Sequence, residues 1–186
     1  MNRTDFIKKQ IYGIILDIGH ESGSLHELIF NKNVYGLDLY VKKYKKNSVK
    51  GDAQYMPFKN KSFDSLIAGE VIEHLIEPNK FLKECKRVLK NNGLIIISTP
   101  NKKSLINRIF KSSFHKWHVS LFDVDSIKEI ISNYFIIEKI FCSYYDSVSS
   151  WGSKHKRLYK FRKFIHYFLP KNFQENIIIL GRNIEK

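Results

Sequence analysis

One apolar segment near the start of the chain ends in residues that could hold a ligand. Segment 14–18 is apolar apart from Asp17, Gly19 and Gly23 follow it, and Leu25 begins an apolar pattern with helical spacing. A strand, a glycine turn and a helix present backbone N–H groups and a helix N-terminus to a ligand. The negative charge of Asp17 favours a ligand with a cationic or amine-bearing part over one led by phosphate.

Polar residues also stand where the next strand candidates end. Asp38 ends the second candidate, Asp52 lies in the third, and the pair Gly69-Glu70 follows the fourth. The carboxyl ends of parallel strands meet at one edge of a sheet, where the ligands of such sheets bind. We therefore expect these residues and Asp17 to converge on one site.

The elements that must position these residues alternate between strand and helix to about residue 140. This alternation predicts a parallel, doubly wound sheet. Pro78 begins a helix whose apolar face runs to Leu89, and Asn92-Gly93 closes it. Segment 93–100 is apolar without alternation, which is typical of a strand buried on both faces.

The C-terminal part departs from this alternation. Asp123 caps a further helix, and two last strand candidates cover 135–144 and 176–181. The insert between them, 144–172, contains a basic amphipathic helix. Without a compact crossover helix, the last two strands are expected to pair as an antiparallel hairpin at one edge. Segment 101–121 is polar, basic and aromatic, and is interpreted as a lid or acceptor loop.

Composition indicates one basic α/β domain over residues 1–186. The 186 residues are 43% hydrophobic, and the net charge is +14. That charge indicates either a lysine-rich surface, which is the simpler explanation, or an anionic partner. The anionic partners considered are nucleic acid, an acidic membrane surface and a phosphorylated substrate. Cys85 and Cys142 lie far apart in apolar patterns, so two buried thiols are expected, and no metal-ligand spacing is visible.

The chain is expected to be cytoplasmic. No apolar run approaches the roughly 18 residues of a membrane span. Segment 1–5 is expected to lead straight into the first strand, and it lacks the core of a signal peptide.

The ordered motifs resemble the class I S-adenosylmethionine-dependent methyltransferases, near the branch that methylates ubiquinone and menaquinone. The resemblance covers about residues 12–140 and rests on Leu16–Gly19 with Gly23, Gly36–Asp38, Gly51–Phe58, Ser62–Leu75, Phe81–Gly93, Ile97–Asn101 and His118–Phe122. It implies a Rossmann-like, doubly wound sheet of seven strands, mostly parallel with an antiparallel last strand. It also implies S-adenosylmethionine as cofactor.

The resemblance assigns a role to each binding residue. The turn around Gly19 would approach the methionine part of the cofactor, and Asp38 would accept hydrogen bonds from the ribose hydroxyls. Asp52 would accept one from the adenine amino group, with the Ala53 N–H at the ring edge. The full cofactor-binding set is Asp17, Gly19, His20, Gly23, Asp38, Leu39, Asp52, Ala53, Gly69 and Glu70. Glu21 departs from the family, in which many members have Gly.

Methyl transfer is a direct displacement, and a general base helps if the acceptor is a hydroxyl or an activated carbon. The candidate catalytic bases are His74, His115 and His118. A small molecule is the expected acceptor. The motifs specify neither its identity nor the oligomeric state.

Three other functions compete with this interpretation. A dinucleotide oxidoreductase expects Gly-x-Gly-x-x-Gly, which the chain lacks. A nucleic-acid methyltransferase agrees with the charge, but the fourth strand ends in Ala-Gly-Glu rather than the Asn/Asp-Pro-Pro-aromatic signature. An inactive methyltransferase-like binding protein would be consistent with Glu21. A peripheral membrane contact through basic segment 154–169 is a further alternative.

Overall fold

A computed structural model describes residues 3–19, 33–41, 47–105, 118–143 and 173–184, together with positions 108, 164, 168 and 170. Several sequence predictions lie outside these described residues. They are the helix after the glycine turn, His20, Gly23, Glu21, His115, much of the lid segment 101–121 and most of the insert 144–172.

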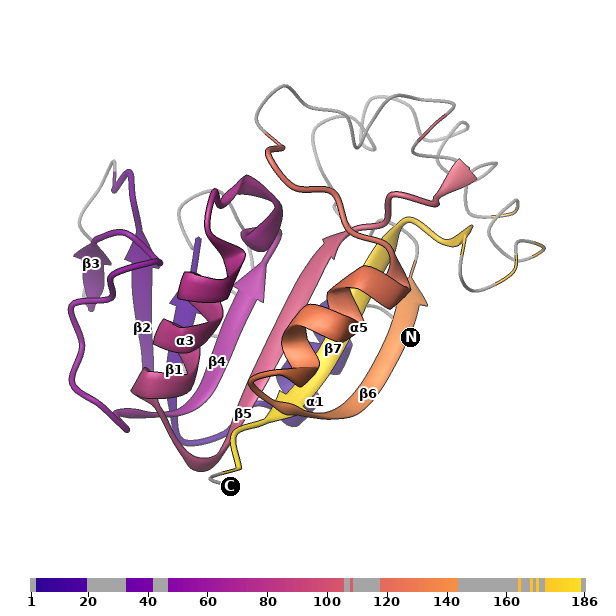
Figure 1. Ribbon diagram of the computed structural model, residues 1–186. Helices are drawn as coiled ribbons and strands as arrows, with labels where there is room; N and C mark the ends of the chain where they lie inside the picture. Colours follow the sequence, from indigo (N-terminus) through magenta and orange to yellow (C-terminus); the bar gives the residue numbers. More distant parts are fainter. Residues whose placement is uncertain are drawn as a thin grey trace.

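The described residues form a seven-stranded sheet with the order β3-β2-β1-β4-β5-β7-β6 (Figure 1). Its strands are β1 Ile14–Ile18, β2 Asn33–Asp38, β3 Ser48–Lys50, β4 Phe63–Gly69, β5 Leu89–Pro100, β6 Ile136–Ser143 and β7 Asn176–Arg182. Neighbours from β3 to β5 pair in parallel, whereas β7 runs antiparallel to both β5 and β6. The predicted mixed, mostly parallel fold and the antiparallel edge pair are therefore confirmed.

Helices cover both faces of this sheet. Helix α3 (Pro78–Val88) and helix α5 (Val124–Ser132) lie on one face, and α1 (Arg3–Gln10) lies on the other (Figure 1). Successive residues of β5 alternate between the two cores, with Ile95 and Ile97 in one and Leu94 and Ile96 in the other. The continuous apolar pattern of this strand is thus explained by burial on both sides, as predicted.

Helix α3 begins at Pro78 as expected and buries Phe81, Leu82, Cys85 and Val88. It ends at Val88, so the prediction that Asn92-Gly93 closes it was wrong. Leu89 already belongs to β5, and Asn92, with a φ of +59°, lies within that strand. Position 93 favours glycine, because the Cβ of any other residue would lie only 2.8 Å from the Lys90 carbonyl oxygen.

Helix α5 confirms the predicted cap at Asp123. The Asp123 side chain accepts from the N–H groups of Asp125 and Ser126, and the Ser126 hydroxyl accepts from the Asp123 N–H. Ile127 and Ile131 enter the core.

Two further sequence predictions, about the segment before β1 and about the third strand, were wrong. The segment before β1 was expected to have no helix, but α1 is there and buries Phe6 and Ile7. Its sequence has too few apolar residues to show a helical period. The third strand was expected over 49–53, but β3 ends at Lys50, and the chain then turns at Asp52.

The expectation of two buried thiols is confirmed for Cys85 and only in part for Cys142. Cys85 is buried and Cys142 is partly buried, and both are free thiols. No helix among the described residues is long and apolar enough to cross a membrane.

Candidate functional site

A cavity of about 280 Å³ lies where strands β1, β2 and β4 end. In the strand order, β1 stands between β2 and β4, and the sheet is extended in both directions from there. Ligands of doubly wound sheets bind at such a reversal. The cavity is lined by seven residues predicted from sequence, which are Gly19, Asp38, Leu39, Asp52, Ala53, Glu70 and His74.

Two predicted residues lie behind this lining rather than in it. Asp17 is buried within β1, and Gly69 is the last residue of β4. Tyr40, Val71 and Leu75 line the cavity as well, and the sequence motifs did not single them out. Tyr40 is 72% exposed, so it stands at the open side of the cavity.

Gly19 shapes the wall of the cavity after β1. Its φ of +76° lies in the left-handed region, and a Cβ at this position would lie 2.7 Å from the Val71 Cγ2 atom. Its N–H donates to the Leu37 carbonyl oxygen at 2.8 Å. Gly19 therefore serves close backbone approach rather than donation to a ligand.

Asp38 and Asp52 are held by local turns at neighbouring strand ends. Asp38 Oδ1 accepts from the Tyr40 N–H at 2.9 Å, and Asp52 Oδ1 accepts from the Gln54 N–H at 2.8 Å. The Gly51 N–H joins the two turns by donating to the Asp38 carbonyl oxygen at 2.9 Å. Both aspartates lie in the lining of the cavity.

The loop 51–62 that carries Asp52 is anchored to α3 by an ion pair. Arg87 donates to both Glu84 oxygens at 2.7 Å, and its Nη2 and Nη1 atoms also donate to the carbonyl oxygens of Met56 and Phe58. Glu84 in turn accepts from the Met56 N–H at 2.7 Å. The Arg87 guanidinium holds the pKa of Glu84 below its usual value, and the Met56 N–H adds to this effect.

Glu70 connects the cavity to α1. Arg3 Nη1 lies 3.0 Å from Glu70 Oε1 and also donates to the Ser98 hydroxyl at 3.3 Å. Glu70 has a φ of +57°, which a non-glycine residue adopts at a cost of roughly 1–3 kcal/mol. Backbone strain of this kind clusters at functional sites.

Glu73 follows one turn later and is completely buried. Its Oε2 atom accepts from the Thr99 hydroxyl at 3.1 Å, while its carbonyl oxygen accepts from the N–H groups of Val119 and Ser120. Burial raises the pKa of the Glu73 carboxyl to about 8, and the charge of Glu70 acts in the same direction. The main-chain bonds bring the segment that starts at His118 against the end of β4.

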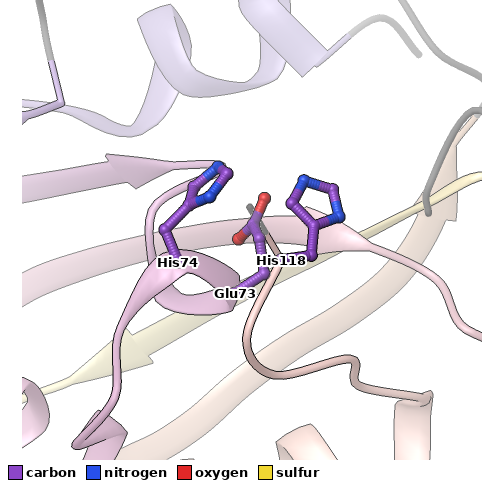
Figure 2. A group of neighbouring side chains, drawn as sticks. All are labelled: Glu73, His74 and His118. Atoms are coloured by element: carbon purple, nitrogen blue, oxygen red, sulfur yellow. The ribbon is translucent and has the colours of Figure 1, made fainter. Parts of the chain in front are cut away.

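His118 and His74 therefore meet, although they lie far apart in the sequence. Their ring centroids are 4.8 Å apart with an interplanar angle of 68°. Figure 2 shows the Glu73 carboxylate between the two rings. The structure thus brings together two of the three predicted bases, and it adds Glu73, which sequence reasoning missed. The available signal was the Glu-His pair directly after β4.

The cavity offers space and hydrogen-bond acceptors to a ligand such as the S-adenosylmethionine that the resemblance implies. Asp38 and Asp52 lie in its lining, and a side chain at Gly19 would crowd Val71, which lines the cavity as well.

Comparison with known proteins agrees with this geometry. Residues 16–97 match the methyltransferase domain family. An uncharacterized protein of Methanocaldococcus jannaschii is 31% identical over 141 residues, which cover 71% of this chain and 59% of that protein. The ubiquinone biosynthesis O-methyltransferase of Pelagibacter ubique is 35% identical over 101 residues, covering 47% of this chain and 42% of the enzyme. The chain therefore spans roughly half the length of these curated relatives.

The fold also matches solved structures. A S-adenosylmethionine-dependent methyltransferase from Archaeoglobus fulgidus superposes with a TM-score of 0.72 at 21% identity, over 97% of this chain and 91% of that one. Residues 16–97 thus match a methyltransferase domain, and the chain has the fold of a solved S-adenosylmethionine-dependent methyltransferase.

Proposed function

We propose that the protein transfers a methyl group from S-adenosylmethionine to a small-molecule acceptor. The observation that carries this proposal is the cavity at the ends of β1, β2 and β4, lined by Gly19, Asp38 and Asp52. An ordinary surface cavity would not be expected to collect these residue types at three successive strand ends.

Each residue has a defined task in this proposal. The bound cofactor supplies a methyl group on a positively charged sulfur. Asp38 accepts hydrogen bonds from two adjacent ribose hydroxyls, and Asp52 accepts one from the adenine amino group. Gly19 allows the backbone to approach the amino-acid part, and buried Asp17 adds negative charge behind it. The main catalytic contribution of the chain is alignment of donor and acceptor.

The acceptor class is inferred from chemistry and from relatives. The end of β4 carries Gly69-Glu70 and lacks the signature of exocyclic amino methylation in nucleic acids. One similar relative is, by its name, an O-methyltransferase of ubiquinone biosynthesis. The net charge of +14 is the observation that favours RNA as a second candidate.

Cofactor binding is the first test. Calorimetric titration of the purified protein with S-adenosylmethionine and with S-adenosylhomocysteine should give micromolar binding at one site. If neither ligand binds, the chain is a methyltransferase-like binding protein and the proposed activity is wrong.

The acceptor is tested separately with cofactor labelled in its methyl group. The protein is incubated with a panel of phenols, amines and acidic carbon compounds, and in parallel with total RNA. Label in an extractable small product supports the proposal. Label that appears in RNA alone replaces it with nucleic-acid methylation.

A further inference from the structure

A group of metal-ligating side chains lies beside the cavity and has no task in cofactor binding. Glu73 and His74 come from the short helix η1 (Ile72–His74), and His118 lies near the end of the predicted lid segment 101–121. A carboxylate oxygen of Glu73 and one ring nitrogen from each histidine all lie within 4.8 Å of one another. Figure 2 shows the three side chains directed toward a common point.

The Glu73 carboxylate is only half satisfied. Its Oε2 atom is bonded to the Thr99 hydroxyl, whereas its Oε1 atom is buried and has no hydrogen-bond partner among the described residues. An unsatisfied buried polar atom is destabilising and requires an explanation such as a bound ion. The two imidazole rings beside this carboxylate make a cation the explanation that fits the surroundings.

We propose that Glu73, His74 and His118 bind a divalent first-row transition metal ion. Two imidazoles and one carboxylate form a ligand set that suits Zn²⁺ and related ions better than Mg²⁺ or Ca²⁺, which prefer all-oxygen sites. Ligand atoms of one such ion lie up to about 4 Å apart. The observed group therefore closes on an ion by moving roughly 1 Å or less.

The protein frame supports this closing. Glu73 is fixed by its burial, and the main-chain bonds from Val119 at 2.9 Å and Ser120 at 3.0 Å hold the backbone beside His118. His74 is exposed and its ring contacts that of His118. Glu70, whose charge also acts on Glu73, is engaged with Arg3 at 3.0 Å and is not counted as a ligand.

The position of the ion suggests its task. His74 also lines the cavity, so the cation would lie at the cavity wall with one or more coordination positions left for water or acceptor. A divalent cation lowers the pKa of an oxygen that it binds. This gives His74 and His118 the role of ligands in place of the general bases expected from sequence.

This task rests on the proposed methyl transfer, whereas metal binding does not. The proposed task of the cation favours an acceptor whose hydroxyl oxygen binds the cation. The hydroxyl proton leaves to solvent water, and the freed oxygen lone pair forms the bond to the methyl carbon. The carbon–sulfur bond breaks at the same time, and its electron pair stays on sulfur.

Metal binding is tested on the full chain after removal of metals with a chelator. Zn²⁺ binding is measured by calorimetry, and Mn²⁺ binding is measured by electron paramagnetic resonance. The wild-type chain should bind one ion. The variants Glu73→Gln, His74→Ala and His118→Ala should each weaken binding at least tenfold. Glu77→Gln, at an exposed acid that precedes helix α3, should leave binding unchanged.

Circular dichroism on each variant checks that the chain is folded, and His74→Ala tests an exposed ligand should the buried change at Glu73 disrupt folding. Failure of the wild-type chain to bind either ion, or equal binding by folded variants, would overturn the site. S-adenosylmethionine binding is measured on the same metal-free protein. Cofactor binding without metal binding rejects this inference alone, and metal binding without cofactor binding rejects the proposed function alone.

Discussion

Gly19 shows how a single residue type can be required by backbone and by space together. Its positive φ excludes most side chains, and the Val71 methyl group occupies the place of a Cβ. Gly69, at the end of the neighbouring strand β4, meets neither condition, since its φ is not positive and a Cβ there would lie 3.6 Å from the Ser98 hydroxyl. The two glycines therefore form a matched pair for testing the first turn.

We expect Gly19→Ala to lower the free energy of unfolding by about 2 kcal/mol, because the left-handed backbone conformation is unfavourable for alanine and its Cβ would crowd Val71. Gly69→Ala should change this free energy by no more than about 0.5 kcal/mol. Urea denaturation of both variants measures the difference. Equal effects would mean that the turn at Gly19 relaxes without strain.

Asp38 is the residue whose substitution should weaken cofactor binding most directly. The change Asp38→Ala removes a charge-assisted acceptor for the ribose and should weaken S-adenosylmethionine binding by about 2 kcal/mol. Glu129→Ala, an exposed acid on α5, is the matched control and should bind as the wild type does. Calorimetry that gives one affinity for both variants would show that the ribose is held elsewhere.

At the scale of elements, α3 does more than cover the sheet. Its Glu84 and Arg87 fasten loop 51–62 through three main-chain groups. This loop carries Asp52 and Ala53 to the cavity. An element that packs on one face thus sets the position of binding residues at the strand ends.

We expect Glu84→Gln to destabilise the fold by about 2 kcal/mol near neutral pH, the scale of hydrogen bonds to a charged group. The folded-state pKa of Glu84 is lowered from 4.5. The unfolded chain therefore binds the proton first, so the stabilisation is present above pH 4.5 and is lost as pH falls through the folded pKa.

The measurement is urea denaturation of both proteins from pH 7 down to pH 3. The difference between wild type and Glu84→Gln should shrink as the solution becomes acidic, while Glu129→Gln should follow the wild type throughout. A difference that stays constant with pH would show that the carboxylate charge is not what holds the loop.

At the scale of the whole molecule, the sequence predicted the parts that depend on local pattern. Alternating elements, the cap at Asp123 and the strand-end acids Asp38 and Asp52 were all visible in short segments. The meeting of His74 with His118 was not, because it depends on main-chain bonds from Val119 and Ser120 to Glu73. Likewise, nothing in the lysine-rich sequence of α1 indicates that Arg3 reaches Glu70 beside the cavity.

Helix α1 packs on the second face of the sheet, and its residues Phe6 and Ile7 belong to the core there. Phe6 is 2% exposed and packs edge-to-face on Phe141 of β6, with ring centroids 4.7 Å apart. The core that contains Phe6 also includes Leu180 of β7 and Ile67 of β4. Residues from the beginning, middle and end of the chain therefore share one apolar cluster.

Because this cluster spans the sheet, we expect Phe6→Ala to lower the free energy of unfolding by about 3 kcal/mol, the cost of a large cavity in a core. Ile76→Ala, at a side chain that is 78% exposed, should have little effect. Urea unfolding followed by circular dichroism and by intrinsic fluorescence should give coincident transitions, since two-state loss of a shared core affects both probes together. Separate transitions, with the helical signal lost first, would instead mean that α1 detaches on its own and that the face it covers does not depend on it.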